Sequence, residues 1–196
     1  MNVLYEDSGT FKVGVVLTEH EASLHVESPH GKRAKIKSAS VVLRFKEAGP
    51  LDFLERAERL AADIDTDFLW EVCGADEFSF AELAAEYYGR APSPIEASAI
   101  LLKLHSAPVY FNRKGKGRFK AAPPETLKAA LAGLERKRQQ DAQIAAWVQE
   151  LENGAMPAAL QAILPQLLYK PDRNRIETKA FEAACESLRL SPPKLR

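Results

Sequence analysis

The residues best suited to chemistry lie in one short stretch, FNRKGKGRFK, at positions 111–120. It contains five basic residues, two glycines and no acidic residue. Lysine and arginine neutralise phosphates, and glycine lets a backbone come close to a sugar-phosphate chain. The stretch therefore predicts a nucleic-acid site. Its candidate contacts are Arg113, Lys114, Lys116, Arg118, Phe119 and Lys120.

The aromatic residues of this stretch allow two interpretations. An exposed Phe119 ring would stack on an unpaired base. Alternatively, the rings face the core and the lysines only keep a sheet edge soluble. We favour the core for the rings and nucleic acid for the cations, because the density of charge exceeds what solubility needs. A second basic turn, HGKRAKIK, adds the candidates Lys32, Arg33, Lys35 and Lys37, with an ordinary charged hairpin as the alternative.

The charge along the chain is sharply sorted. The 196 residues hold 27 basic and 27 acidic groups, so the formal net charge is zero. Residues 47–96 contain three basic and thirteen acidic residues, whereas residues 97–140 contain ten basic and two acidic ones. An acidic block of this kind would repel nucleic acid and orient it by exclusion, or face a basic partner surface.

No complete catalytic or metal-binding motif accompanies these cations. Three histidines lie five residues apart in a strand-rich segment, where alternation turns them to different faces. The acidic run DIDTDF lacks the glycine and distal glutamate of a calcium loop, and we interpret it as the start of a helix. No P-loop, dinucleotide-binding or GxSxG sequence is present. We therefore expect no catalytic residue, metal ligand or cofactor in this chain.

The elements that must position the basic residues fall into three sections, which predict an α+β fold. Residues 1–47 contain four or five short strand patterns between turns and no helix pattern, which is typical of a small antiparallel β-barrel. Residues 48–123 contain two capping boxes, at 79–82 and 93–96, separated by a tight turn. Residues 124–196 predict a helical segment that leads toward a further domain.

A hairpin follows the two capped helices. VYF and RFKA have strand composition, and NRKGKG has the composition of the loop between them. Two helices, a tight turn and a hairpin are the order of a winged helix, a variant of the helix-turn-helix. The second helix, at 94–106, would be the one that reads DNA. It is mostly apolar with Lys103 as its single Lys or Arg, which disfavours base reading in a major groove.

Several stretches resemble the N-terminal region of bacterial ribonuclease II-like exoribonucleases of the RNB family. They are MNVLYEDSGTFKVGVV, SPHGKRAKIK, VYFNRKGKGRFKAAP, LERKRQQ and LLYKPDRNRIETKAFEAAC. The resemblance implies an accessory region that guides single-stranded RNA to a downstream catalytic domain of the same protein. That domain would cleave RNA from the 3′ end with Mg²⁺ held by aspartates. No match to the aspartate motif occurs here, so the resemblance assigns no catalytic residue to this chain.

Two other functions fit the same residues. One is a winged-helix regulator that binds DNA, and the other is a protein-interaction module whose acidic block docks on a partner. The longest apolar runs fall far below the roughly 18 residues that span a bilayer. The N-terminus lacks a basic start followed by an apolar stretch, and the two cysteines form no CxxC pair. We therefore expect a cytoplasmic protein without a membrane partner.

Overall fold

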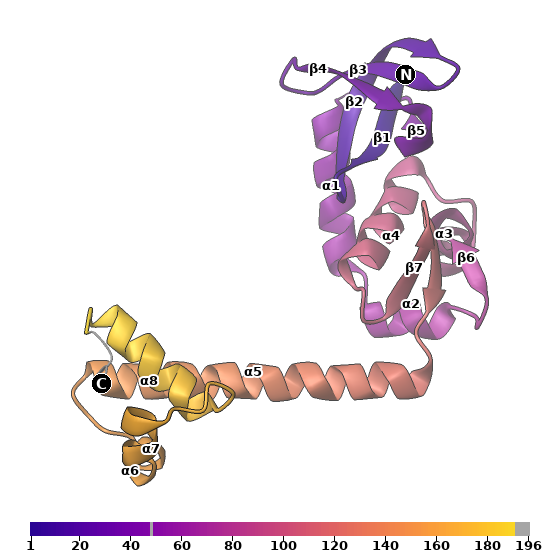
Figure 1. The fold of residues 1–196 in the computed structure, drawn as a ribbon. Helices are drawn as coiled ribbons and strands as arrows, with labels where there is room; N and C mark the ends of the chain where they lie inside the picture. Colours follow the sequence, from indigo (N-terminus) through magenta and orange to yellow (C-terminus); the bar gives the residue numbers. More distant parts are fainter. Residues whose placement is uncertain (48, 191–196) are drawn as a thin grey trace. The chain divides into compact units, whose positions relative to one another are not determined.

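The structure is a computed structural model, and it describes residues 1–47 and 49–190. The chain is α+β: the described residues form two antiparallel sheets and eight α-helices (Figure 1). It divides into two compact units, Met1–Leu127 and Lys128–Arg196. The first unit contains both sections expected at 1–47 and 48–123, and each unit is described by itself below.

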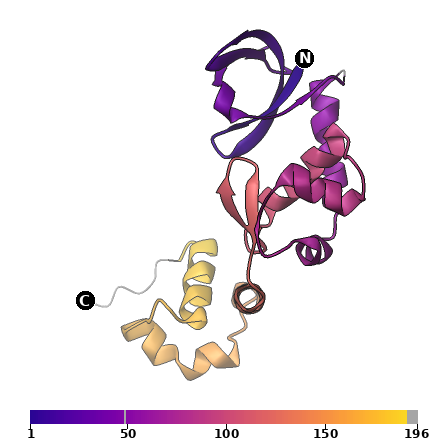
Figure 2. The same cartoon turned by 90° about the vertical axis from the view of Figure 1, so that its right-hand side faces the viewer.

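Five strands at the start of the first unit form a curled antiparallel sheet (Figure 2). Their order is β4-β3-β2-β1-β5, so β4 and β5 are the edges, and no strand pairing among the described residues closes the sheet into a barrel. A 3₁₀ turn at Ser38–Ser40 joins β4 to β5, where the sequence predicted no helix. The strands are β1 (Asn2–Asp7), β2 (Thr10–His20), β3 (Ser23–Glu27), β4 (Arg33–Lys37) and β5 (Val41–Phe45).

Strand β1 is buried on both faces from Asn2 to Tyr5, which explains its apolar run Val3-Leu4-Tyr5. Val3 and Tyr5 pack with Leu24 inside the curl of the sheet. Leu4 points the other way and joins the larger core that the helices share with the sheet. Successive side chains of a strand alternate between faces, so a strand covered on both sides needs apolar residues at every position.

Helix α4 contributes the most buried residues to the larger core, which it shares with α1 and the five-stranded sheet. Phe45 of β5 stacks on Phe53 with ring centroids 3.7 Å apart, which joins the sheet to the first helix. The buried residues of α4 complete this core; they are Ala97, Ser98, Ala99, Ile100, Leu101 and Leu104. The helices of the first unit are α1 (Pro50–Asp63), α2 (Thr66–Val72), α3 (Phe80–Tyr88) and α4 (Pro94–Ser106).

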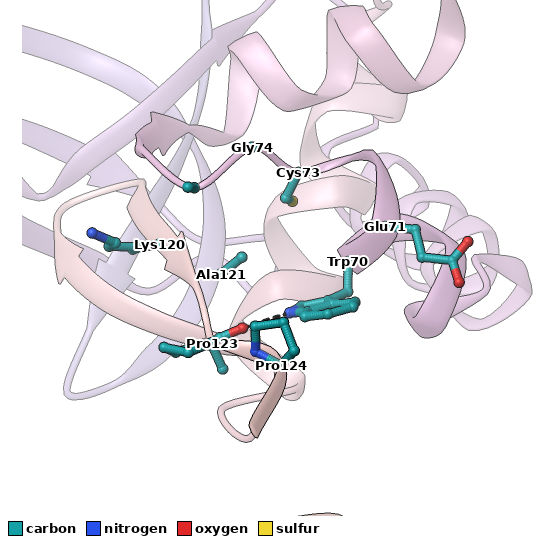
Figure 3. A pocket seen from close by; sticks show the side chains of 10 residues that line it. Trp70, Glu71, Cys73, Gly74, Lys120, Ala121, Pro123 and Pro124 are labelled. Carbon is teal, nitrogen blue, oxygen red and sulfur yellow. Dashed lines mark hydrogen bonds between the residues drawn. The ribbon is translucent and has the colours of Figure 1, made fainter. Parts of the chain in front are cut away.

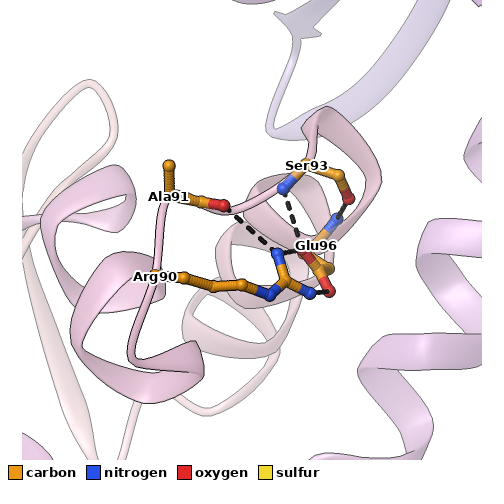
Figure 4. Close-up of polar contacts among 4 residues, drawn as sticks. All are labelled: Arg90, Ala91, Ser93 and Glu96. Atoms are coloured by element: carbon orange, nitrogen blue, oxygen red, sulfur yellow. Dashed lines mark hydrogen bonds and ion pairs between the residues drawn. The ribbon is translucent and has the colours of Figure 1, made fainter.

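Local polar contacts fix the helix starts, as the sequence predicted. The Asp65 carboxylate accepts a hydrogen bond from the Phe68 N–H at 3.0 Å, so the run DIDTDF is a helix start. Both capping boxes are formed; the pairs are Ser79–Glu82 and Ser93–Glu96. Arg90 donates two hydrogen bonds to Glu96, at 3.0 and 2.6 Å, and one to the Ala91 carbonyl (Figure 4). These contacts hold the tight turn between α3 and α4.

The basic hairpin, defined here as residues 111–121, belongs to a three-stranded sheet of order β6-β8-β7. The sequence placed residues 112–115 in a loop, but they belong to strand β7 and only two residues form the turn. The third strand, β6, was not predicted, because three residues carry too little pattern. The strands are β6 (Glu77–Ser79), β7 (Phe111–Gly115) and β8 (Arg118–Ala121).

The C-terminal section is helical, as predicted. Helix α5 crosses the boundary between the units, and the residues in its middle are exposed. Pro165 stands in the first turn of α7, where proline is tolerated because the first amides of a helix have no partner within it. Leu160, Leu167, Ala180 and Ala184 are buried in this unit. The helices are α5 (Pro124–Glu152), α6 (Ala158–Ala162), α7 (Leu164–Tyr169) and α8 (Ile176–Ser187).

Candidate nucleic-acid interface

Both arginines of the basic hairpin are engaged by carboxylates. Arg113 donates to both oxygens of Glu6 on β1, at 2.8 and 2.6 Å. The Nε of Arg118 donates to Glu77 on β6 at 2.6 Å. The hydrogen bond from Arg113 is the main cause that lowers the pKa of Glu6, and the pKa of each arginine is raised by its carboxylate partner. An incoming phosphate would have to compete with these carboxylates.

Phe119 does not present its ring to a ligand. It is 2% exposed and lies in the larger core, where it is paired in register with Phe78 of β6. Alternation along β8 turns the flanking Arg118 and Lys120 outward and Phe119 inward. Phe119 is therefore not a base-stacking residue, and the interpretation that the sequence favoured, in which the rings face the core, is correct for this ring.

The turn of the basic hairpin is anchored to the body of the unit. The N–H of Phe80, the first residue of α3, donates to the Gly117 carbonyl at 2.9 Å. Gly117 has a φ of 63°, and a Cβ there would lie 2.9 Å from Cδ1 of Phe80. The nearby protein also desolvates the Lys116 amine and lowers its pKa. The turn is therefore held against α3 rather than projecting freely.

Three lysines of the basic hairpin keep their charge accessible. Lys114, Lys116 and Lys120 are exposed, and none of them forms an ion pair with another described residue. Lys120 is nevertheless paired across the sheet with Glu77, the same residue that holds Arg118. Of the five hairpin cations, two are neutralised and a third lies beside an acidic side chain.

The second candidate segment has fewer of its cations paired with carboxylates. We call residues 32–37 the basic edge, because they form the outermost strand β4 and the residue before it. Arg33 is paired with Glu27 on the neighbouring strand at 2.9 Å. Lys35 lies opposite His25, and Lys37 lies opposite Ser23. Since residues at i, i+2 and i+4 share a face, Arg33, Lys35 and Lys37 point to one side of the sheet.

Three of the four cations of the basic edge are unpaired among the described residues, compared with three of the five in the basic hairpin. Lys32, Lys35 and Lys37 are exposed, and within residues 1–47 and 49–190 none of them forms an ion pair. The sequence favoured nucleic acid for the hairpin cations, whereas for this segment it left nucleic acid and an ordinary charged hairpin open. The acidic partners of the hairpin arginines, Glu6 and Glu77, were not among the predicted site residues. Glu6 is 107 positions from Arg113, and no local pattern joins the two.

A pocket of about 430 Å³ lies beside the basic hairpin, between α2 and the end of β8 (Figure 3). The indole N–H of Trp70 donates to the Ala122 carbonyl at 2.9 Å and forms part of its wall. Lys120 and Glu71 lie on opposite sides of the pocket. Burial, with a smaller contribution from Glu86, raises the pKa of the Cys73 thiol to about 12. The thiol therefore stays protonated at neutral pH and is a poor nucleophile.

Two further findings concern the described part of the chain. It contains no group of three or more His, Cys, Asp or Glu side chains placed to hold a metal ion. None of its helices combines the length and the apolar character that crossing a bilayer requires.

Comparison with family models, with curated proteins and with solved structures finds no match for this chain. The resemblance to RNB-family enzymes therefore rests on the sequence stretches alone. The function has to be argued from the arrangement of the charged residues.

Proposed function

We propose that the first unit binds single-stranded RNA through the basic edge, with the accessible lysines of the basic hairpin as secondary contacts. The observation that carries the proposal is the set of three exposed lysines, Lys32, Lys35 and Lys37, without ion pairs among the described residues. Proteins that bind single strands without sequence preference track the backbone with such cations.

In this proposal the chain is an accessory region of an RNB-like 3′-5′ exoribonuclease. Hydrolysis and its Mg²⁺ would belong to a catalytic domain of the same protein, and this chain would guide RNA toward it. The order of α3, α4, β7 and β8 supports a winged-helix assignment for the second section. The curled five-stranded sheet supports a small, barrel-like module for the first.

Duplex DNA is a weaker candidate ligand, because α4 lacks a suitable surface. A helix that reads a major groove presents Arg, Asn or Gln to base edges. Six residues of α4 are buried in the core, and Lys103 is its single Lys or Arg. The protein-interaction alternative is also weakened. Part of the acidic block is already engaged by a helix cap or an arginine, as in Glu77, Glu82 and Glu96, so fewer of its carboxylates are free to meet a partner.

The test compares two charge-matched triple variants in binding a 12-nucleotide single-stranded RNA across a salt series. If three to five phosphates are neutralised, log K of the unmodified chain should fall with log salt at a slope of about −2 to −3.5. Lys32→Ala/Lys35→Ala/Lys37→Ala should reduce that slope by about 2 units and weaken binding about 100-fold at 0.1 M salt. Lys114→Ala/Lys116→Ala/Lys120→Ala, which removes the same charge, should cost less.

All six lysines are exposed, so we expect both variants to keep their fold, which circular dichroism would check. An edge variant that binds RNA as tightly as the unmodified chain would refute the proposal. Tighter binding of duplex DNA in direct competition would instead favour the DNA-binding regulator.

A further inference from the structure

A groove of about 390 Å³ lies where the curled sheet meets the start of α1. The β1–β2 hairpin, the turn before β4 and the first turns of α1 enclose it. Its apolar walls include Phe11, Leu51 and Leu54, and Lys12 and Lys32 also line it. Ligand pockets typically measure about 300–1,000 Å³, so this groove suits a small planar group rather than a large ligand.

The walls of the groove expose apolar surface next to the basic edge. Leu51 is 41% exposed, although it stands in the first turn of α1, where a polar residue would be at no disadvantage. Phe11 is half-buried, and its ring is fixed by an edge-on contact with His105, with ring centroids 5.0 Å apart. A fixed aromatic ring beside aliphatic side chains gives an apolar contact surface of defined shape.

The charges around the groove are unevenly distributed. Lys12 is held by Asp7 at 2.6 Å, so the charges on that side cancel. On the side of the basic edge, Lys32 lines the groove without an ion partner among the described residues. Lys35 and Lys37 lie farther along β4, on the face opposite that of Ala34, and do not line the groove. The positive charge that remains uncompensated at the groove is therefore that of Lys32, where the basic edge begins.

We propose that this groove receives the base of one unpaired nucleotide, belonging to the RNA strand whose phosphates lie on the basic edge. The inference rests on the proposed function and adds a site to it. Cations beside an apolar cavity match the two halves of a nucleotide, the charged phosphate and the flat base. Every base has an aromatic face, so such a site accepts any unpaired base and excludes a base held in a duplex.

The test separates contacts with bases from contacts with phosphates. It measures the affinity of the full chain for a 12-nucleotide single-stranded RNA and for an abasic sugar-phosphate strand of the same length, each across a salt series. Stacking contributes about 1–3 kcal/mol per base. The unmodified chain should therefore prefer the strand with bases by about fivefold or more, at a similar salt slope.

Ala34→Phe should fill the groove without changing the charge. Ala34 is exposed on β4 and lines the groove, so the added ring would occupy the space of the base. This variant should lose the preference for bases and keep the salt slope. Ala39→Phe is the matched control, because Ala39 is exposed but does not line the groove, and it should keep the preference. Leu51→Ala, at an exposed position, provides a second test that removes wall surface and should weaken the preference.

The possible failures can be told apart. A normal salt slope with equal affinity for both strands would overturn the groove inference and leave the proposed function intact. Retention of the preference by both Ala34→Phe and Leu51→Ala would do the same. Loss of salt-dependent binding altogether would overturn the proposed function itself.

Discussion

The basic hairpin and the basic edge are both rich in Lys and Arg but have different surroundings. Both arginines of the hairpin are bound by carboxylates, from Glu6 on β1 and Glu77 on β6. In the basic edge, Arg33 is the one cation with an ion pair among residues 1–47 and 49–190, and its partner is Glu27 on the adjacent strand. The segment with more cations thus offers a smaller fraction of them to a ligand. Cation density along a sequence measures the charge that is present, and the neighbouring elements determine how much remains accessible.

The position of each strand in its sheet explains the contrast for Arg118 and Lys120, whereas Arg113 lies on the edge strand β7 and is paired with Glu6 of the other sheet. Strand β8 lies between β6 and β7, so its side chains have neighbours on both sides, and one of these neighbours is acidic. Strand β4 is an edge, with β3 as its single partner strand among the described residues. Lysines are common on edge strands because they discourage further strand pairing. The same placement leaves these lysines free to meet a polyanion.

The largest effect that tests this comparison should come from the anchored turn of the hairpin. Gly117→Ala places a Cβ 2.9 Å from Phe80 at a φ of 63°, which a residue with a side chain rarely adopts. We expect a loss of about 2 kcal/mol in the free energy of unfolding, measured by urea denaturation. Gly115→Ala is the control, since a Cβ there meets no atom within 4 Å. Equal stability of the two variants would show that the turn is not anchored.

The next effect should come from releasing one arginine of the hairpin. Glu77→Gln removes the partner of Arg118 and the acidic neighbour of Lys120. One additional phosphate contact should raise RNA affinity about fivefold at 0.1 M salt and steepen the salt slope by about 0.7. Glu71→Gln changes the net charge equally at an exposed carboxylate that has no ion pair among the described residues. The same gain in both variants would mean that net charge, and not the release of Arg118, controls binding.

The smallest effect concerns the pairing of Glu6 with Arg113. The hydrogen bond from Arg113 lowers the pKa of Glu6 below its ordinary value of 4.5. The pair therefore stabilises the fold above pH 4.5, and this contribution is lost as the pH falls through the lowered pKa. Glu6→Gln should reduce stability at pH 7 by less than about 1 kcal/mol, since the pair is partly exposed to solvent.

Thermal unfolding of Glu6→Gln and the unmodified chain between pH 7 and about pH 2 would measure this dependence. The difference in stability between the two proteins should shrink as the pH falls. A difference that does not change across this range would exclude the ion pair as its cause. Glu21→Gln, at an exposed residue without an ion pair in the described part of the chain, should show no such dependence.

Much of the fold could be predicted because its signals are local. The capping boxes that begin α3 and α4, and the proline in the first turn of α7, depend on residues within one helical turn. Strand β1 lacks the alternation of apolar and polar residues that identifies a half-exposed strand, because both of its faces are covered. The extent of β7 was also missed, since its polar residues Asn112, Arg113 and Lys114 resemble a loop in composition.

The candidate site was only partly predictable for the same reason. The sequence located every cation that the proposal uses, because lysine and arginine are charged wherever the chain places them. It could not show which of these cations are free of ion pairs and accessible to a ligand. The ring of Phe119 and the guanidinium of Arg113 are removed from the interface by residues distant in sequence, Phe78 and Glu6.

The sequence by itself determined the α+β class, the helix starts and the positions of the two basic segments. These depend on hydrogen bonds, side-chain alternation and charges within a few residues. The tertiary structure alone decided which cations are neutralised, which ring is buried and where a groove lies beside accessible lysines. Ion pairs and packing contacts act over a few ångströms in space. The separation of two residues along the chain does not determine whether the fold brings them that close.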